Sequence, residues 1–266
     1  MIEPGGGATL LAVRDVAVHF GGIVALAGVS FHVSGSEICG LIGPNGSGKT
    51  TLFNCISGIY RPTRGEVVVD GHRVAGEKRY RMADLGIGRT FQNLALFRSL
   101  TVADNILVGA HHLGRSGFIA NALRLRSAGV EEAAAQARLG PLLALLGLEA
   151  VADRRVSDLP FGTAKRVELG RALIGQPRLL LLDEPAGGLN HGEVDELAVL
   201  LGRIRAHFSL SILLVEHHMS LVMRVSDHVV ALEFGRKIAE GSPDAVRRNP
   251  EVIRAYLGEA EHADVA

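Results

Sequence analysis

Two hydrophobic periodicities follow each other along this chain, and together they predict a mixed α/β protein. Alternating, β-branched stretches predict antiparallel strands near the beginning, at residues 10–18 and 28–33. Three further strands are predicted, at residues 37–42, 67–71 and 86–92. From residue 179 onward, strand and helix patterns alternate, as a mostly parallel sheet requires.

Helical spacing dominates between these two halves, and it predicts an inserted helical lobe at residues 94–159. Helices are expected over residues 101–110, 115–128 and 129–148, with Thr101 as an N-cap. Gly140, Pro141 and Gly147 are expected to break the Ala/Leu-rich run at residues 131–148, which favours helix packing over membrane contact. The predicted division is a core at residues 8–93 and 160–258, the helical lobe, and a frayed polar tail at residues 259–266.

Charge and composition narrow the class of protein. Lys plus Arg and Asp plus Glu each total 28, so no overall field attracts nucleic acid or anionic lipid. Every apolar run is interrupted before the roughly 20 residues that span a bilayer, and the first ten residues lack the features of a signal peptide. We therefore expect a cytoplasmic protein. Cys39 and Cys55 have apolar neighbours, which favours buried thiols over the alternative of a disulfide or redox switch.

The segment GPNGSGKTT, residues 43–51, predicts a site for nucleoside triphosphate. It lies between a predicted strand and a predicted helix, and its glycines allow backbone N–H groups to converge on a phosphate. Lys49 is expected to reach the β- and γ-phosphates, and the Thr50 hydroxyl to bind Mg²⁺. The predicted nucleotide contacts also include Asn45, Gly46, Ser47, Gly48 and Thr51.

Two carboxylates follow the apolar strand LLLL at residues 179–182. Packing explains the leucines of a buried parallel strand, but it does not explain Asp183 and Glu184. We expect Asp183 to contact Mg²⁺ and Glu184 to polarise the attacking water, with a solvated acidic turn as the alternative.

The stretch LPFGTAKRVELGRAL, residues 159–173, makes the pattern specific. Together with GPNGSGKTT, LLLLDEP and LLVEHH it resembles the nucleotide-binding subunit of an ATP-binding cassette (ABC) transporter, over nearly the whole chain. The resemblance implies a P-loop ATPase fold with an antiparallel β subdomain and a helical subdomain. It also implies that a signature segment caps the ATP of an opposite subunit, and the matching residues are Leu159, Pro160, Phe161, Gly162 and Thr163. Pro160 stands where the family has Ser, so this cap loses a hydroxyl and an N–H.

The same resemblance assigns roles to four more residues. Gln92 matches the glutamine that ligates the metal and senses the γ-phosphate, and a buried structural amide is the alternative. His217 matches the histidine that bonds the γ-phosphate, although His218 is adjacent and a shift of one residue stays open. Phe20 matches the aromatic residue that stacks on adenine, with a core position as the alternative. Asn190 matches an aspartate of the loop that links subunits.

The extended helical lobe and three further stretches point to a branch of the family. RTFQNLALFRSLTVADNILVGAHH, EPAGGLN and the tail GSPDAVRRNPEVIRAYLGE resemble the ATPases of branched-chain amino acid importers. The resemblance implies ATP and Mg²⁺ as cofactors, and as partners a second ATPase subunit, two membrane permeases and, indirectly, a periplasmic or extracellular solute-binding protein. It also implies that this chain lies at the cytoplasmic face of the cell membrane. In the tail, five apolar residues have the helical spacing to pack on the core: Val246, Val252, Ile253, Tyr256 and Leu257.

Other functions remain open on the sequence alone. The cargo is either a branched-chain amino acid or another solute such as urea, an amide or an aromatic acid. A soluble ABC ATPase of DNA repair or translation is disfavoured, because the chain has neither a long coiled-coil insertion nor a second cassette. A small-molecule kinase would share the phosphate loop, but it has no need for residues 159–173.

Overall fold

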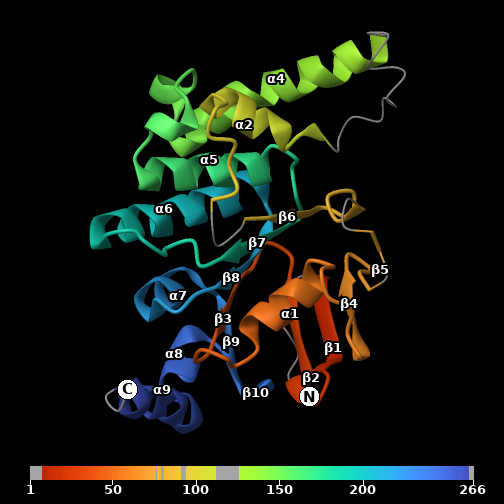
Figure 1. The fold of residues 1–266 in the computed structure, drawn as a ribbon, viewed down its shortest axis with the longest axis vertical. Coiled ribbons are helices and arrows are strands. Elements are labelled where there is room, and N and C mark those ends of the chain that lie inside the picture. Colours follow the sequence, from red (N-terminus) through yellow and green to blue (C-terminus); the bar gives the residue numbers. More distant parts are fainter. Residues whose placement is uncertain (1–7, 76, 79–80, 91–93, 112–125, 264–266) are drawn as a thin grey trace.

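The computed structural model describes residues 8–75, 77–78, 81–90, 94–111 and 126–263. It contains two sheets with helices around them, and Figure 1 shows the helical region at one end and the last helix near the other. The four-stranded sheet has the order β2-β1-β4-β5 and is antiparallel. Its strands are β1 (Thr9–Phe20), β2 (Ile23–Ser34), β4 (Arg64–Val69) and β5 (His72–Arg73).

The six-stranded sheet has the order β10-β9-β3-β8-β7-β6, and all its neighbours are parallel except β10 and β9. Its strands are β3 (Ile38–Ile42), β6 (Ile87–Arg89), β7 (Leu179–Asp183), β8 (Ser211–Val215), β9 (His228–Glu233) and β10 (Arg236–Gly241). The predicted fold class is confirmed, and the strand predicted at residues 86–92 has its described part in β6.

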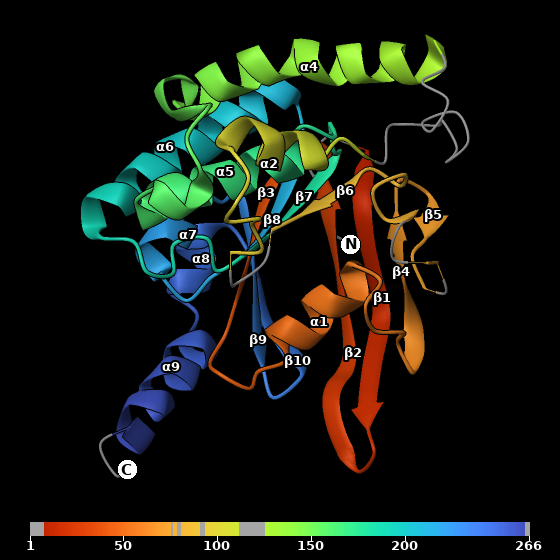
Figure 2. The same ribbon diagram turned by 45° about the horizontal axis from the view of Figure 1, so that its top comes forward.

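Alternation along the central strands builds two cores on opposite faces of this sheet. Leu179 and Leu181 face α1 (Lys49–Ile56) and the antiparallel sheet, whereas Leu180 and Leu182 face the other helices. Helix α1 is therefore packed between the two sheets, as Figure 2 shows. The other face is covered mainly by α5 (Phe161–Leu173), α6 (His191–Phe208), α7 (Met219–Val225) and α8 (Pro243–Arg247).

The helical region is built on α5. Helices α2 (Val102–Val108) and α4 (Arg126–Leu146) both pack on it, and two short turns follow, η3 (Glu149–Val151) and η4 (Val156–Asp158). Thr101 is the N-cap of α2, as predicted, and its hydroxyl accepts the backbone N–H of Asp104. The helix predicted at residues 115–128 falls mostly outside the described residues.

The predicted break at Gly140 and Pro141 is wrong. Helix α4 continues through both residues to Leu146, and only Gly147, with φ +66°, follows its end. Pro141 is exposed, whereas Leu139, Leu142, Leu143 and Leu146 are all at least 93% buried in the core. Burial of such leucines contributes about 1.5–3 kcal/mol each, which outweighs the roughly 3 kcal/mol cost of one helical proline.

The last helix, α9 (Pro250–Ala263), also differs from the prediction, because it extends through most of the residues expected to be frayed. Val246 and Val252 are buried against the core and Tyr256 packs on it, as predicted. Ile253 is 46% exposed, so that part of the prediction is wrong, and the Leu257 side chain lies outside what is described. Cys39 and Cys55 are buried free thiols, and burial raises the pKa of Cys55 to about 12.

Candidate functional site

The loop between β3 and α1 has the backbone of a phosphate cradle. Gly43, Gly46 and Gly48 have φ values of +150°, +77° and +102°, which side chains disfavour. A Cβ atom on Gly43 would lie 2.2 Å from the carbonyl oxygen of Leu232, and one on Gly48 would lie 2.8 Å from that of Ala25. A Cβ atom on Gly46 would meet nothing within 4 Å. Two glycines are therefore required by the packing of the loop, and Gly46 lies where a phosphate has room to approach.

Polar groups of the same loop face one another. Lys49 is 93% buried, and its Nζ donates to the carbonyl oxygens of Gly43 at 2.6 Å and Pro44 at 2.9 Å. The buried Ser47 hydroxyl has no hydrogen-bond partner among the described residues. Gly48, the N-cap of α1, has no side chain to cap the helix, so an anion there would complete the cap. The other predicted contacts of the loop are Asn45 and Thr50, which are exposed, and Thr51, which is half-buried.

The central strands place the remaining candidates beside this loop. In the parallel register Leu41 of β3 pairs with Val215 of β8, and Val215 pairs with Asp183 of β7. The carboxyl ends of these three strands therefore lie at one edge of the sheet, where ligands bind in open α/β folds. The structure thus brings the phosphate loop, Glu184 and His217 to a single edge.

Glu184 and His217 face each other across the ends of two strands. The Nδ1 atom of His217 lies 3.9 Å from the Oε1 atom of Glu184. Glu184 has φ +47°, a conformation that costs about 1–3 kcal/mol in a non-glycine residue. Its N–H donates to Val215 at 2.9 Å, and its carbonyl accepts from Lys165 Nζ at 3.2 Å and from Gly187 N–H at 3.0 Å. These bonds hold the strained residue in place.

Asp183 is a buried acid next to the half-buried guanidinium of Arg89. Its Oδ2 atom lies 3.8 Å from Arg89, whose guanidinium also donates to Ser57 Oγ at 2.6 Å and lies over the Phe53 ring. Burial raises the pKa of Asp183, Arg89 lowers it, the nearby Glu184 and Glu216 raise it, and Lys49 lowers it. A carboxylate that is costly to keep charged fits a position where a cation binds.

Phe20 is exposed at the end of β1 rather than buried in the core. It is 46% exposed, and its ring makes an edge contact with Tyr60 at 5.3 Å between centroids. An exposed aromatic face is available for stacking. Gln92 lies outside the described residues.

The predicted signature segment forms the beginning of α5. Pro160 is the N-cap and makes no side-chain capping bond, Phe161 is 47% exposed, and Leu159, Gly162 and Thr163 are half-buried. A Cβ atom on Gly162 would lie 2.6 Å from Oε1 of Glu193. In both views α5 lies in the helical region, away from α1 (Figures 1 and 2). The structure does not bring this segment to the phosphate loop of its own chain.

Asn190 has a local structural role. It is the N-cap of α6, where its Oδ1 accepts the N–H of Glu193 at 3.0 Å and its own N–H donates to Glu193 Oε2 at 2.9 Å. This reciprocal capping box needs an acceptor side chain but no charge, which explains how asparagine is accommodated here.

Three residues that contact the site had no predicted role. Lys165 and Arg89 hold Glu184 and Asp183, and Glu216 is a fully buried carboxylate between the strand β8 and His217. The sequence gives little indication of Lys165 and Arg89, because each is a single cation within a helical or strand pattern. Glu216 repeats the pattern of Asp183, an acid at the end of an apolar strand, and that pattern identifies it.

Comparisons with known proteins agree with this geometry. Residues 26–187 match the ABC transporter family model, and residues 236–262 match that of the branched-chain amino acid ATP-binding cassette transporter. The chain is 39% identical to the high-affinity branched-chain amino acid transport ATP-binding protein BraF of Pseudomonas aeruginosa, and 42% identical to LivG of Salmonella typhimurium. Both alignments cover 94% of this chain and 98% of the relative.

Solved structures show the same likeness. The crystal structure of the ADP conformation of MJ1267, an ATP-binding cassette of an ABC transporter, superposes with a TM-score of 0.80 at 30% identity. The match covers 94% of this chain and 99% of that one. The chain therefore belongs to the ATP-binding proteins of ABC transporters, which bind ATP and couple its hydrolysis to transport. Within that family it is an ATP-binding subunit of the branched-chain amino acid transporter group, together with LivG and BraF.

Membership of this family implies permease partners, which supply the path across the membrane. In the described part of the chain no helix combines the length and the apolar character needed to span a bilayer.

Proposed function

We propose that this chain powers the import of branched-chain amino acids, with Glu184 and His217 acting on the attacking water and the γ-phosphate. The observation that carries the proposal is the approach of His217 Nδ1 to Glu184 Oε1, 3.9 Å apart at the edge that holds the phosphate loop. The packing of the strands does not require Glu184 and His217 to approach each other, and neither does the solvation of surface side chains. Hydrolysis of ATP, in contrast, requires a base for the attacking water and a hydrogen-bond donor to the γ-phosphate at this position.

The nucleotide is held by the loop at residues 43–51. Lys49 Nζ exchanges its two carbonyl acceptors for oxygens of the β- and γ-phosphates, and the backbone N–H groups around Gly46 and Gly48 surround the phosphates. Phe20 stacks on the adenine from the end of β1.

A Mg²⁺ ion is the best match for the acid beside this loop. Thr50, Asp183 and Gln92 are the residues proposed to hold it, and oxygen ligands of this kind suit the ion. When bound, Mg²⁺ neutralises charge on the phosphate oxygens. The burial of Asp183 and its raised pKa support this assignment, because a nearby cation offsets the cost of the buried charge.

The chain's own residues then carry out proton transfer. Glu184 accepts a proton from the attacking water at a carboxylate oxygen, and His217 donates a hydrogen bond to the γ-phosphate. The hydrogen bonds to the Glu184 backbone keep its side chain in position for this step. His217, rather than His218, is proposed for the role, because the ring of His218 is hydrogen-bonded to Glu216 at 3.2 Å, whereas Nδ1 of His217 lies 3.9 Å from both Glu184 and Glu216.

Efficient hydrolysis is proposed to need a second ATPase subunit, either identical or different. Residues 159–163 would cap the ATP of the partner, since α5 begins there with uncapped N–H groups. Asn190 lies at the start of α6, and its capping partner Glu193 lies beside Gly162, so Asn190 would face the same partner. Pro160 weakens this cap, so the two sites of a heterodimer would be unequal.

The remaining partners follow from the transporter group. Two permeases would contact the helical region, residues 94–159, near Gln92, and this docking would hold the chain at the cytoplasmic face of the membrane. Closure of the ATPase dimer at the core, residues 8–93 and 160–258, would then be transmitted to the permeases through the helical region. A solute-binding protein outside the membrane would select the cargo without touching this chain.

Uptake by the assembled transporter tests this function. Cells or proteoliposomes that contain the transporter should take up labelled leucine, isoleucine or valine when ATP is supplied. The same transporter with Lys49→Ala should not, because the loss of a charge-assisted contact to phosphate weakens nucleotide binding on the order of 10–100-fold. Uptake of urea, an amide or an aromatic acid instead would replace the proposed cargo, and the absence of permeases in a copurified complex would contradict the transport role.

A further inference from the structure

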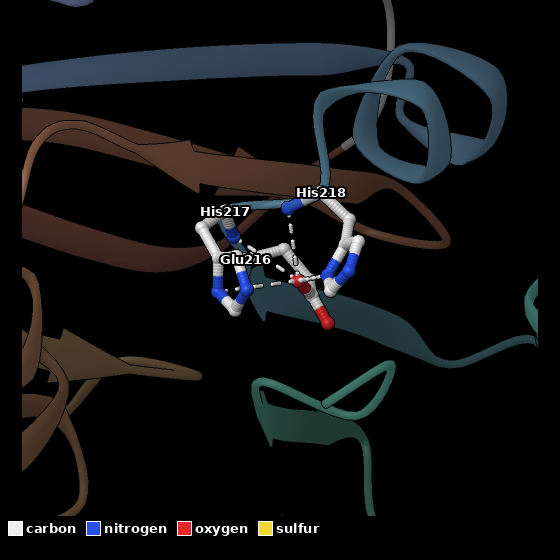
Figure 3. A group of neighbouring side chains, drawn as sticks. All are labelled: Glu216, His217 and His218. Carbon is white, nitrogen blue, oxygen red and sulfur yellow. Dashed lines mark hydrogen bonds and ion pairs between the residues drawn. The ribbon is translucent and has the colours of Figure 1, made fainter. Parts of the chain in front are cut away.

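Glu216 has an unusual position for an acid, since its side chain is fully buried directly after β8. A buried carboxylate is retained in a fold only when its oxygens are satisfied. Its Oε1 atom accepts the N–H of Ala186 at 2.7 Å. Its Oε2 atom accepts the N–H groups of His217 at 3.0 Å and His218 at 3.2 Å, and the His218 ring at 3.2 Å (Figure 3). The two oxygens therefore bind two different segments of the chain.

The first segment is the turn that presents the proposed base. Ala186 lies two residues after Glu184, whose backbone has the left-handed φ of +47°. The turn continues through Gly187, whose N–H donates back to the Glu184 carbonyl. The hydrogen bond from Ala186 to Glu216 therefore holds the turn in which Glu184 follows the end of β7.

The second segment is the loop that presents the proposed phosphate contact. With both backbone N–H groups bound to one oxygen, the rings of His217 and His218 lie on either side of the Glu216 carboxylate, with 4.4 Å between their centroids (Figure 3). The His218 ring turns onto Glu216, and because a carboxylate only accepts, its Nδ1 carries the proton. The Nδ1 atom of His217 lies 3.9 Å both from Oε1 of Glu184 and from Oε2 of Glu216. Glu216 thus binds the His218 ring and leaves the His217 ring beside Glu184.

These three residues have the donor types of a metal site, and their ligand atoms lie within 4.8 Å of one another. The hydrogen bonds disfavour that interpretation. Oε2 of Glu216 already faces two backbone N–H groups, and these groups cannot rotate away to admit a cation. A metal at that oxygen would be repelled by their partial positive charges.

We propose that Glu216 is a positioning residue of the ATPase reaction, which couples the turn carrying Glu184 to the loop carrying His217. The inference rests on the roles proposed above for those two residues. One carboxylate holds both segments, so a movement of either segment is transmitted to the other. The base and the phosphate contact then take up their reactive positions together.

The test replaces Glu216 in the assembled transporter and measures ATP hydrolysis and ATP binding separately. Glu216→Gln keeps the size of the side chain, but its NH₂ group faces N–H donors on one side and cannot hold both segments. Since a misplacement of about 1 Å costs on the order of 10²-fold, we expect kcat to fall by that order. The affinity for a fluorescent ATP analogue should stay within about twofold, because the phosphate loop is unchanged.

Two further variants separate positioning from a general loss of stability. Glu216→Asp keeps the charge but is one methylene shorter, so it reaches one segment only and should also lower kcat. This variant provides the test if the glutamine variant fails to fold. Glu240→Gln is the matched control, because it removes a carboxylate of β10 that is bonded to His228 on β9 and to Lys237 on β10. This control should lower the thermal unfolding midpoint without changing kcat.

A double-mutant comparison decides the coupling. If Glu216 acts through both segments, the loss of kcat caused by Glu216→Gln should be smaller in a His217→Ala background than in the unmodified protein, because only the turn that carries Glu184 is then left to misplace. A kcat within about twofold of the unmodified protein in both Glu216 variants would overturn the inference, and so would fully multiplicative losses in the double variant. Failure of the proposed function would look different, because His217→Ala itself would then leave hydrolysis intact.

Discussion

The hydroxyl of Tyr256 lies 2.8 Å from the backbone nitrogen of Gly43 and accepts its N–H, although 213 residues separate the two in the chain. Gly43 is the first glycine of the phosphate loop, and Tyr256 lies in α9, within the stretch matched by the branched-chain amino acid transporter model. The last helix is thus bound directly to the nucleotide site.

Tyr256→Phe should therefore lower the stability of the nucleotide-free protein. It leaves the buried N–H of Gly43 without its acceptor, which costs about 1–3 kcal/mol. At about 2–4 °C per kcal/mol, calorimetry should record a clear fall of the unfolding midpoint. Tyr60→Phe is the matched control, since it removes the hydroxyl of a half-exposed tyrosine, and it should leave the midpoint unchanged. Equal midpoints in the two variants would show that the bond contributes nothing.

Asp183→Asn should raise the stability of the nucleotide-free protein at neutral pH while abolishing hydrolysis. Burial raises the pKa of Asp183, so the native state carries a charge it disfavours at pH values above that raised pKa. As the pH falls, the native state takes up a proton before the unfolded state does, and the advantage of the asparagine variant should narrow. Thermal unfolding between neutral and acidic pH measures this directly, and a less stable variant at pH 7 would contradict it.

Glu240→Gln should behave in the opposite way. Burial raises the pKa of Glu240, but hydrogen bonds and charge from His228 and Lys237 outweigh it and lower the pKa to about 2. A lowered pKa means that the carboxylate stabilises the fold at pH values above its usual pKa of 4.5, and that this contribution is lost as the pH falls from there to about 2. The glutamine variant should therefore unfold at a lower temperature at pH 7 and approach the unmodified protein in acid. A constant difference across that range would exclude the assignment.

Lys165→Met should slow hydrolysis without weakening ATP binding. Lys165 donates to the carbonyl of the strained Glu184, and a hydrogen bond from a charged group contributes about 1.5–3 kcal/mol. If a large part of that energy holds Glu184 in place, kcat should fall on the order of tenfold. The neighbouring Arg166→Met removes only an ion pair with Glu196 at the surface, so it should leave the rate unchanged. Equal rates in both variants would show that the bond does not position Glu184.

Pro160→Ser should raise the ATPase activity of the assembled transporter. The start of α5 has no side-chain capping bond, and a serine there supplies a hydroxyl toward the phosphate of the partner's ATP. A charge-assisted bond of about 1.5–3 kcal/mol strengthens ATP binding, so the gain in activity should be largest at low ATP concentration. Activity should therefore be measured across a range of ATP concentrations. Unchanged or lower activity would show that Pro160 is not what limits this cap.

Much of the site was predictable because its parts are local in sequence. The phosphate loop, Asp183 and Glu184 each follow an apolar strand, and parallel strands bring their carboxyl ends to one edge. The orientation of the His217 and His218 rings was not predictable, since it depends on the hydrogen bonds that the buried Glu216 makes to both residues. Tyr256 was expected to pack on the core, but its bond to Gly43 joins segments whose separation no local pattern reveals.

The helical region shows where local rules fail. Gly140 and Pro141 disfavour a helix by themselves, yet α4 continues through them because four leucines on one side are buried. The capping box of Asn190 and Glu193, in contrast, is a local pattern of two residues spaced three apart, so the sequence alone reveals it. Propensity is overridden where packing supplies the larger energy.

Turnover of Glu184→Gln in the assembled transporter tests the central claim most directly. Glutamine keeps the shape of the side chain but accepts no proton, so ATP binding should remain near normal while hydrolysis falls about 10²–10⁴-fold. The variant should accumulate as a closed dimer of ATPase subunits with ATP bound, visible by size-exclusion chromatography. Normal turnover in that variant would contradict the account, because the base would then have to be a residue other than Glu184.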